Sequence, residues 1–273
     1  QGWPYFTEHL VLATPDNGVA TAIYAACKAT VKVGDGKEIT LHEETNYPFE
    51  EDIAFTVSTG EKVAFPFYLR IPSWTQKAEA RVNGKKVSAA PVAGKYLCIN
   101  REWANGDRVE LTLPMSLSMR TWQVNKNSVS VDYGPLTLSL KIAEKYVEKD
   151  SRETAIGDSK WQKGADPQKW PTTEIYPDSP WNYSLVLDKK EPLKNFKVIR
   201  KSWPADNYPF TVVSVPLEVK AIGRPVPEWK IDETGLCGVL PEEDAVKGDK
   251  EEITLIPMGA ARLRISAFPN TKE

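Results

Sequence analysis

The chain has 273 residues, of which 41% are hydrophobic, and this combination is typical of a globular protein with one large core or two smaller ones. Its 35 basic and 37 acidic residues leave a formal charge of -2, which excludes the broad positive field that attracts nucleic acids and anionic membranes. The sequence has no run of about 18 apolar residues, so we expect a soluble chain without a membrane partner.

The first ten residues lack the basic and then apolar pattern of a secretion signal. A signal on a preceding part of a longer protein would direct the chain to the periplasm or out of the cell. Its localisation therefore stays open.

The opening segment is apolar and aromatic. Trp3, Phe6 and Leu10 lie at helix-like spacing around Pro4, which predicts a short helix. Isolated helices shorter than about 12–15 residues rarely persist in water, so this helix needs a partner surface. We therefore expect Trp3, Phe6 and Leu10 to contact a domain that precedes residue 1.

From residue 18 the pattern changes to alternation with a period of two, which predicts β-strands. Gly34-Asp35-Gly36 separates two such runs and Asn83-Gly84 separates another two, so both strings indicate tight hairpin turns. The 21 prolines also favour short strands joined by many turns. Further β runs lie at Ile53–Val57, Ala64–Ile71, Tyr96–Ile99, Val109–Leu113, Val129–Tyr133, Leu136–Ile142, Ser184–Leu187, Phe196–Arg200, Phe210–Val215, Leu217–Ala221, Ile253–Ile256 and Ala261–Ala267.

These runs predict a mainly β chain with two β-sandwich or jelly-roll-like units behind the short helix. We place the helical segment at residues 1–14, the first sandwich at 15–141 and the second β domain at 142–273. Residues 143–183 show few regular strands. They are interpreted as an irregular crossing between the two β units rather than as a functional loop.

The acidic and histidine residues predict no catalytic site. Hydrolysis of a glycosidic bond usually needs two carboxylates about 5–10 Å apart, but adjacent acids on a strand point to opposite faces. The clusters Glu43-Glu44, Glu50-Glu51-Asp52 and Glu242-Glu243-Asp244 are therefore interpreted as solvated turns. His9 and His42 fit no catalytic triad.

The cysteines predict neither a metal site nor a disulfide framework. Cys27, Cys98 and Cys237 are odd in number and far apart in the sequence. We expect them to be simple buried thiols.

Three tryptophans, Trp161, Trp170 and Trp181, lie in the irregular segment, where a loop presents side chains to a ligand. One interpretation is an independent carbohydrate-binding module in which these rings stack on sugars. The interpretation that we prefer is that Trp and Tyr side chains cover a thin sandwich core or a domain interface.

Short strings spread over nearly the whole chain carry a family resemblance. They are Gln1-Gly2-Trp3-Pro4, Thr14-Pro15-Asp16-Asn17-Gly18, Tyr24-Ala25, Glu44-Thr45-Asn46-Tyr47-Pro48-Phe49, Leu69-Arg70-Ile71-Pro72-Ser73-Trp74, Val82-Asn83-Gly84, Arg101-Glu102-Trp103, Gly106-Asp107, Leu113-Pro114-Met115, Tyr133-Gly134-Pro135-Leu136, Pro180-Trp181-Asn182-Tyr183, Ile253-Thr254-Leu255-Ile256-Pro257-Met258-Gly259 and Arg262-Leu263-Arg264-Ile265. With these strings the chain resembles the proteins of glycoside hydrolase family 127, once catalogued as domain of unknown function 1680.

The resemblance implies an α/α barrel followed by β-sandwich domains, in enzymes that include retaining β-L-arabinofuranosidases. In characterised members a zinc-bound cysteine is the nucleophile, held with other cysteines and a glutamate. That cluster precedes the segment that Gln1–Phe6 resembles, and Cys27, Cys98 and Cys237 do not match it.

We therefore expect the chain to be the non-catalytic C-terminal β-sandwich part of a glycoside hydrolase that acts on plant or complex glycans, and to be inactive alone. The expected partners are the missing N-terminal α/α-barrel domain, carbohydrate and a second copy in a homodimer. No cofactor is expected in this chain, because the implied zinc belongs to the catalytic part. The sugar is not identified.

Overall fold

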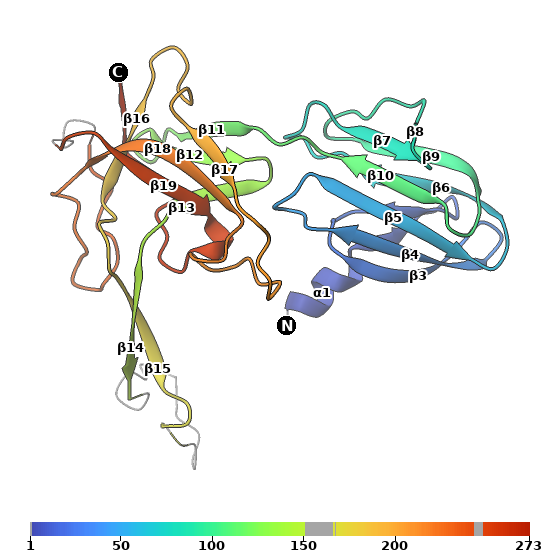
Figure 1. The fold of residues 1–273 in the computed structure, drawn as a ribbon, viewed down its shortest axis with the longest axis horizontal. Coiled ribbons are helices and arrows are strands. Elements are labelled where there is room, and N and C mark those ends of the chain that lie inside the picture. The colour runs from blue at the N-terminus through green and yellow to red at the C-terminus, as the bar shows by residue number, and fades with distance from the viewer. Residues whose placement is uncertain (1, 151–165, 167, 243–247) are drawn as a thin grey trace. The chain divides into compact units, whose positions relative to one another are not determined.

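The computed structural model of the chain describes residues 2–150, 166, 168–242 and 248–273 (Figure 1). Strands dominate the described residues, and the one α-helix among them is short. The prediction of a mainly β fold is therefore confirmed. The chain divides into two compact units.

The division between the units falls within a run of strands. Unit 1 consists of Gln1–Leu117 and Tyr133–Leu136, and unit 2 consists of Ser118–Asp132 and Thr137–Glu273. Most residues of 118–141, which the sequence places at the end of the first sandwich, thus lie in unit 2. The reason is pairing: β11 (Leu117–Trp122), β12 (Ser128–Tyr133) and β13 (Leu136–Leu140) belong to the sheet of unit 2.

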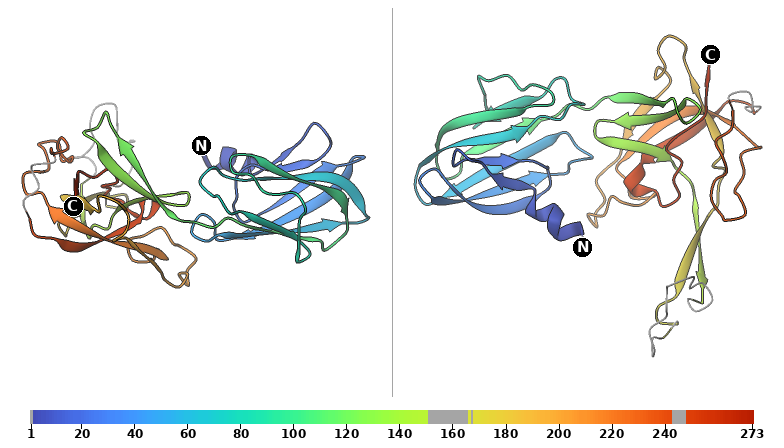
Figure 2. Two further views of the ribbon diagram at one scale, coloured as in Figure 1. Left: turned by 90° about the horizontal axis from the view of Figure 1, so that it is seen from above. Right: turned by 180° about the vertical axis from the view of Figure 1, so that it is seen from behind.

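Unit 1 begins with helix α1 (Gly2–Glu8) and contains two sheets. The four-stranded sheet has the order β1-β2-β6-β9, and the six-stranded sheet has the order β3-β4-β5-β10-β7-β8. Figures 1 and 2 show them as two layers. The strands are β1 (Val11–Ala13), β2 (Val19–Thr21), β3 (Cys27–Val33), β4 (Lys37–Thr45), β5 (Asp52–Thr59), β6 (Val63–Arg70), β7 (Glu79–Val82), β8 (Lys85–Lys86), β9 (Tyr96–Trp103) and β10 (Arg108–Thr112).

The core of unit 1 follows from the alternation along its strands. In β5 and β6 every second side chain is buried, and these inner faces belong to one hydrophobic cluster. Phe55 and Phe67 meet edge to face with ring centroids 5.3 Å apart. Burying such a side chain contributes about 1.5–3 kcal/mol, so this cluster is the main stabilising feature of unit 1.

Both predicted hairpin turns are present in unit 1. Asn83 and Gly84 have φ angles of 50° and 76°, and they join β7 to β8 with Val82 opposite Lys85. Two positive φ angles are what a type I′ turn requires. Gly34 and Gly36 also have positive φ, and they lie between Val33 and Lys37, which pair in the β3–β4 hairpin.

Unit 2 contains one eight-stranded sheet with the order β11-β12-β13-β19-β18-β16-β20, and β17 pairs with β18 beside this path. Its buried side chains include Val131, Leu138, Leu185, Val219 and Leu255. The other strands of this sheet are β16 (Tyr183–Leu187), β17 (Lys197–Arg200), β18 (Leu217–Pro225), β19 (Glu251–Pro257) and β20 (Asn270–Lys272). A 3-10 helix spans Met258–Ala260.

The segment that the sequence predicts as an irregular crossing contains a two-stranded ribbon of unit 2. β14 (Glu144–Lys149) pairs antiparallel with β15 (Thr172–Pro177), from Glu144 opposite Pro177 to Lys149 opposite Thr172 (Figure 1). Neither strand has a buried residue. The sequence therefore lacks the apolar alternation by which a half-buried strand is recognised.

Candidate functional site

The opening helix presents aromatic side chains to solvent. α1 has no buried residue, and Trp3 and Tyr5 are 78% and 66% exposed. Trp3 lies edge-on to Phe6, which is half-buried, with ring centroids 5.8 Å apart. Leu10 differs, because it is buried and its carbonyl accepts a hydrogen bond from the backbone N–H of Ala22. Of the three predicted interface residues, Trp3 and Phe6 thus remain accessible.

The structure separates the three tryptophans of the predicted carbohydrate site. Trp161 lies outside the described residues, and Trp170 is 64% exposed just before β15. Trp181 is half-buried and packs edge-on against the buried Trp229, with ring centroids 5.2 Å apart at 65°. Among these three, only Trp181 lines a described cavity.

That cavity has a volume of about 330 Å³ and lies within unit 2. We call it the Trp181 cavity. It is mostly apolar, and its lining includes Ile175, Tyr176, Trp181, Ile231, Leu236 and Cys237. The wall residues come from the ribbon strand β15, from the segment just before β16, from the loop after β18 and from the segment after the 3-10 helix, so the sequence places them far apart.

Hydrogen bonds hold the loop after β18 against Trp181. The Asn182 amide donates to the carbonyls of Val226 and Trp229, at 3.0 and 3.2 Å. The indole N–H of Trp229 in turn donates to the Gly238 carbonyl at 3.0 Å, and Ile231 forms an isolated bridge with Cys237. The Pro180-Trp181-Asn182-Tyr183 string thereby shapes the cavity. Sequence reasoning missed Trp229 and the loop, since only the β16–β18 pairing brings them to Trp181.

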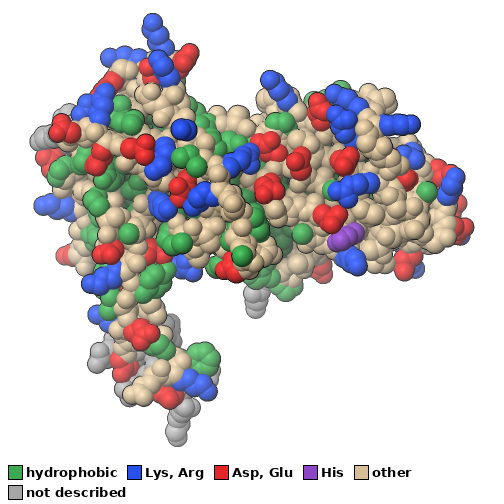
Figure 3. Space-filling view, viewed as in Figure 1, with side chains coloured by type: hydrophobic (Ala, Val, Ile, Leu, Met, Phe, Trp, Pro, Cys, Tyr) green, Lys and Arg blue, Asp and Glu red, His purple; other side chains and the backbone are tan. Residues whose placement is uncertain are grey.

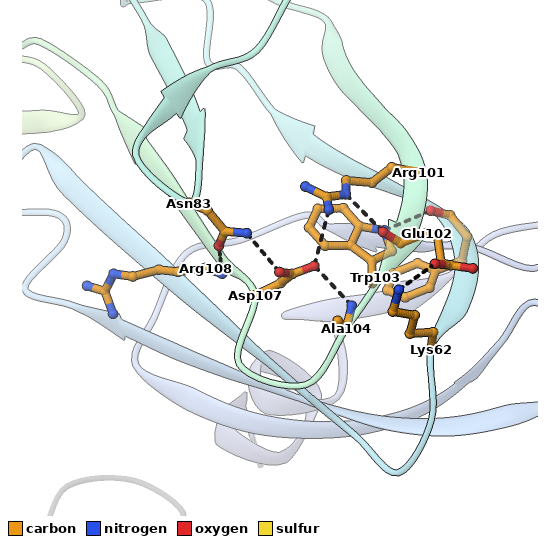
Figure 4. Close-up of polar contacts among 9 residues, drawn as sticks. Lys62, Asn83, Arg101, Glu102, Trp103, Ala104, Asp107 and Arg108 are labelled. Atoms are coloured by element: carbon orange, nitrogen blue, oxygen red, sulfur yellow. Dashed lines mark hydrogen bonds and ion pairs between the residues drawn. The ribbon is translucent and has the colours of Figure 1, made fainter.

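A polar cluster joins two turns of unit 1 (Figure 4). The Asn83 amide donates to Oδ1 of Asp107 at 2.8 Å, and its oxygen accepts the backbone N–H of Arg108 at 2.8 Å. Oδ2 of Asp107 accepts the Ala104 N–H at 3.0 Å and lies 3.5 Å from the Arg101 guanidinium. The guanidinium also lies over the Trp103 ring, 5.1 Å from its centroid.

The electrostatics of this cluster mark it as structural. Burial by itself raises the pKa of Asp107, but the hydrogen bonds from Ala104 and Asn83 and the charge of Arg101 hold that pKa below its ordinary value. Both carboxylate oxygens already have partners. Asp107 therefore links the two turns of unit 1.

Glu43 is buried, which corrects its interpretation as part of a solvated turn. It is 1% exposed because its position in β4 points toward the core of unit 1, whereas the neighbouring Glu44 points outward. Oε2 of Glu43 accepts a hydrogen bond from the Cys27 thiol at 3.8 Å, and Oε1 has no partner among the described residues. Burial raises the pKa of Glu43 to about 8.

The cysteines also differ from the prediction of buried thiols. Cys27 is half-buried, while Cys98 and Cys237 are exposed. Cys98 points outward because the neighbouring Leu97 and Ile99 of β9 point into the core. Burial and then the charge of Glu43 raise the pKa of Cys27 to about 11, so this thiol is far from the thiolate state that a nucleophile needs.

Two exposed carboxylates of unit 1 have nearby polar partners. Glu44 lies 3.3 Å from the Arg108 guanidinium, and Asp52 accepts a hydrogen bond from the Thr112 hydroxyl at 2.7 Å. Acidic and basic side chains are interspersed over the visible face of unit 1 (Figure 3). The described part of the chain has no group of three or more His, Cys, Asp or Glu side chains placed to hold a metal ion. Within the same residues, no helix has the length and apolar character needed to cross a membrane.

Comparison with known proteins confirms the resemblance that the sequence predicts. Residues 18–115 match the family described as beta-L-arabinofuranosidase, GH127 middle domain. No curated protein matches the chain.

Solved structures share the fold over nearly the whole chain. A GH127 beta-L-arabinofuranosidase from Geobacillus stearothermophilus T6 is 20% identical with a TM-score of 0.61, and the match covers 97% of this chain and 35% of that one. A protein described as a glycoside hydrolase is 22% identical with a TM-score of 0.58, and the match covers 94% of this chain and 36% of that one. A GH127 beta-arabinofuranosidase is 21% identical with a TM-score of 0.60, and the match again covers 94% of this chain and 36% of that one. The chain thus spans about a third of the length of these proteins.

Proposed function

We propose that this chain is the non-catalytic β-sandwich part of a glycoside hydrolase similar to the family-127 arabinofuranosidases, and that it supports a helical catalytic domain acting on a plant or complex glycan. The observation that carries the proposal is the match of residues 18–115 to the middle domain of that family. The solved relatives, of which the chain spans about a third, agree with it.

The chemistry of the described side chains supports a non-catalytic role. Retaining and inverting glycosidases usually need a proton donor and a second carboxylate at fixed separation. In unit 1, Asp107 and Glu44 are held by cations, and Glu43 is buried beside a protonated thiol. Asp107, Glu43 and Glu44 are therefore poorly placed to act as a proton donor and nucleophile pair.

The zinc implied by the family resemblance does not fit the described residues either. A zinc–cysteine centre needs several thiolates that converge on one point. Cys27 lies in β3, Cys98 on the outer side of β9, and Cys237 in unit 2 beside the Trp181 cavity. We therefore assign no zinc-binding residue to this chain, and we place the centre in the proposed catalytic domain.

The exposed aromatic residues of α1 support docking of that domain. A seven-residue helix is marginal in water by itself, and α1 leaves Trp3 and Tyr5 largely uncovered. Covering two large aromatic side chains would stabilise the helix through apolar burial. We propose that Trp3, Tyr5 and Phe6 contact the helical domain.

Oxidative footprinting tests this arrangement. The chain is compared with a version extended along the reading frame upstream of Gln1, and hydroxyl-radical oxidation of Trp3 and Tyr5 is measured by mass spectrometry. We expect oxidation of both residues to fall in the longer protein, while Trp170, exposed in unit 2, serves as the reference. Unchanged oxidation of Trp3 and Tyr5, or an upstream frame that encodes no helical domain, would contradict the proposal.

A further inference from the structure

We infer that the Trp181 cavity of unit 2 binds a sugar residue that carries a carboxylate, such as a uronic acid within a glycan. The choice of a glycan rests on the proposed function. The preference for a carboxylate rests on the cavity itself. No comparison with a known protein assigns a ligand to this place.

The aromatic wall of the cavity suits the apolar face of a sugar ring. Trp181 is supported from behind by the buried Trp229, so its ring is held in place. Around it Tyr176, Ile231 and Leu236 are 44%, 44% and 66% exposed. Such a grouping of exposed apolar side chains around a concavity is typical of ligand sites.

Two arginines give the cavity its positive charge. Arg262 and Arg264 both line it and are exposed. Neither forms an ion pair with a carboxylate of the described residues, and the Arg262 side chain hydrogen-bonds Tyr146. The Nε of Arg264 donates to the Ala261 carbonyl at 2.8 Å, which fixes one edge of that guanidinium. Guanidinium groups form paired hydrogen bonds with carboxylates, so a ligand carboxylate would accept hydrogen bonds from these arginines.

The acids near the cavity are already engaged by other groups. Glu144 accepts the backbone N–H of Arg262 at 3.0 Å and the hydroxyl of Tyr146 at 2.5 Å. Oδ1 of Asp232 accepts the backbone N–H groups of Thr234 and Leu236, at 2.9 and 3.1 Å. These acids are therefore held by local hydrogen bonds, and neither forms an ion pair with Arg264 within the described residues. The terminal nitrogens of Arg264 are the donors that a ligand carboxylate would meet first.

The indole N–H of Trp181 and the size of the cavity further restrict which ligands can bind. The indole N–H of Trp181 forms no hydrogen bond within the described residues, although the ring is half-buried. A sugar hydroxyl or carboxylate would accept that proton. The volume of about 330 Å³ is near the lower end of ligand cavities, about 300–1,000 Å³. One or two sugar rings are thus the appropriate size.

The thiol of Cys237 gives a direct readout, because it lines the cavity and is exposed. The intact chain is alkylated with iodoacetamide in the presence of digalacturonate or of neutral galactobiose, and modification of each cysteine is followed by mass spectrometry. Cys98, exposed in unit 1, is the internal control. If the bound state excludes the reagent, Cys237 reacts about tenfold more slowly when the ligand exceeds its Kd about ninefold.

We expect digalacturonate to protect Cys237, galactobiose to protect it far less, and neither to change Cys98. The variants Arg262→Gln and Arg264→Gln should each weaken protection by the acidic sugar, while the control Trp170→Ala should not. Equal protection by both sugars would overturn the carboxylate preference, and no protection by either would overturn the site. Neither result bears on the proposed function, which arabinofuranoside turnover tests separately.

Discussion

The side chain of Asn83 donates a 2.8 Å hydrogen bond to Asp107, and this contact ties the β7–β8 turn to the β9–β10 turn of unit 1 (Figure 4). Asn83 combines two roles, since its backbone adopts a φ of 50° while its side chain bonds Asp107 and Arg108. The two roles can be separated by substitution.

Replacing Asn83 by Ala should destabilise unit 1 by about 1–3 kcal/mol, because it leaves a part-buried carboxylate short of a donor and places Ala at positive φ. Asn83→Gly removes the same hydrogen bonds without the backbone strain, so it should be less harmful. Thermal unfolding of the two variants measures the difference. Equal stability of both variants and the parent chain would show that the contact is dispensable.

The stability of unit 1 should depend on the protonation of Glu43. Its pKa is raised from 4.5 to about 8 in the folded chain, so the folded state keeps a proton that the unfolded state loses. The stabilisation is complete below pH 4.5, declines as the pH rises from there to about 8, and is absent at higher pH. The slope is at most about 1.4 kcal/mol per pH unit.

The variant Glu43→Gln removes this titration. Denaturant unfolding between pH 6 and 8 should show a smaller loss of stability with rising pH in Glu43→Gln than in the parent chain. Glu44→Gln is the matched control, because Glu44 is exposed and paired with Arg108. A parent chain and a Glu43→Gln variant with the same pH dependence would contradict a raised pKa at Glu43.

The opening helix should contribute little to the stability of the isolated chain. Trp3→Ala removes an exposed side chain, so we expect a change within about 0.5 kcal/mol. Leu10→Ala removes a buried side chain and should cost about 2–5 kcal/mol. Calorimetry of both variants checks this contrast. A Trp3→Ala variant as unstable as Leu10→Ala would mean that α1 already has its packing partner within the chain.

The three thiols should differ in reactivity. Cys27 is half-buried with a pKa of about 11, whereas Cys98 and Cys237 are exposed. At pH 8 we expect Cys27 to react with a disulfide reagent at least about tenfold more slowly than the other two, because its thiolate fraction is small. In denaturant all three rates should become similar. Fast labelling of Cys27 in the folded chain would rule out its contact with Glu43.

Local signals in the sequence predicted much of unit 1. Asn83-Gly84 and Gly34-Asp35-Gly36 indicated their turns because only a few residue types, chiefly Gly and Asn, readily adopt a positive φ. The alternation that located β9 also predicts that Cys98 is exposed, because its neighbours Leu97 and Ile99 face inward. The prediction that Cys98 is buried used the residue type alone and ignored this alternation, which is why it was wrong.

Long-range contacts explain what the sequence did not predict. Trp181 was a candidate, but its partner Trp229 and the loop around Leu236 reach it only through sheet pairing across more than forty residues. The burial of Glu43 was missed because acidic residues are rarely found in cores without a partner. The β14–β15 ribbon was missed because strands exposed on both faces have no apolar alternation.

Turnover of an aryl β-L-arabinofuranoside by the purified 273-residue chain, with Zn²⁺ supplied, tests the central claim most directly. The account predicts a rate equal to that of buffer for the chain alone, and hydrolysis once the chain is produced with the sequence upstream of Gln1. Sustained hydrolysis by the chain alone, abolished by a substitution within it, would contradict the account.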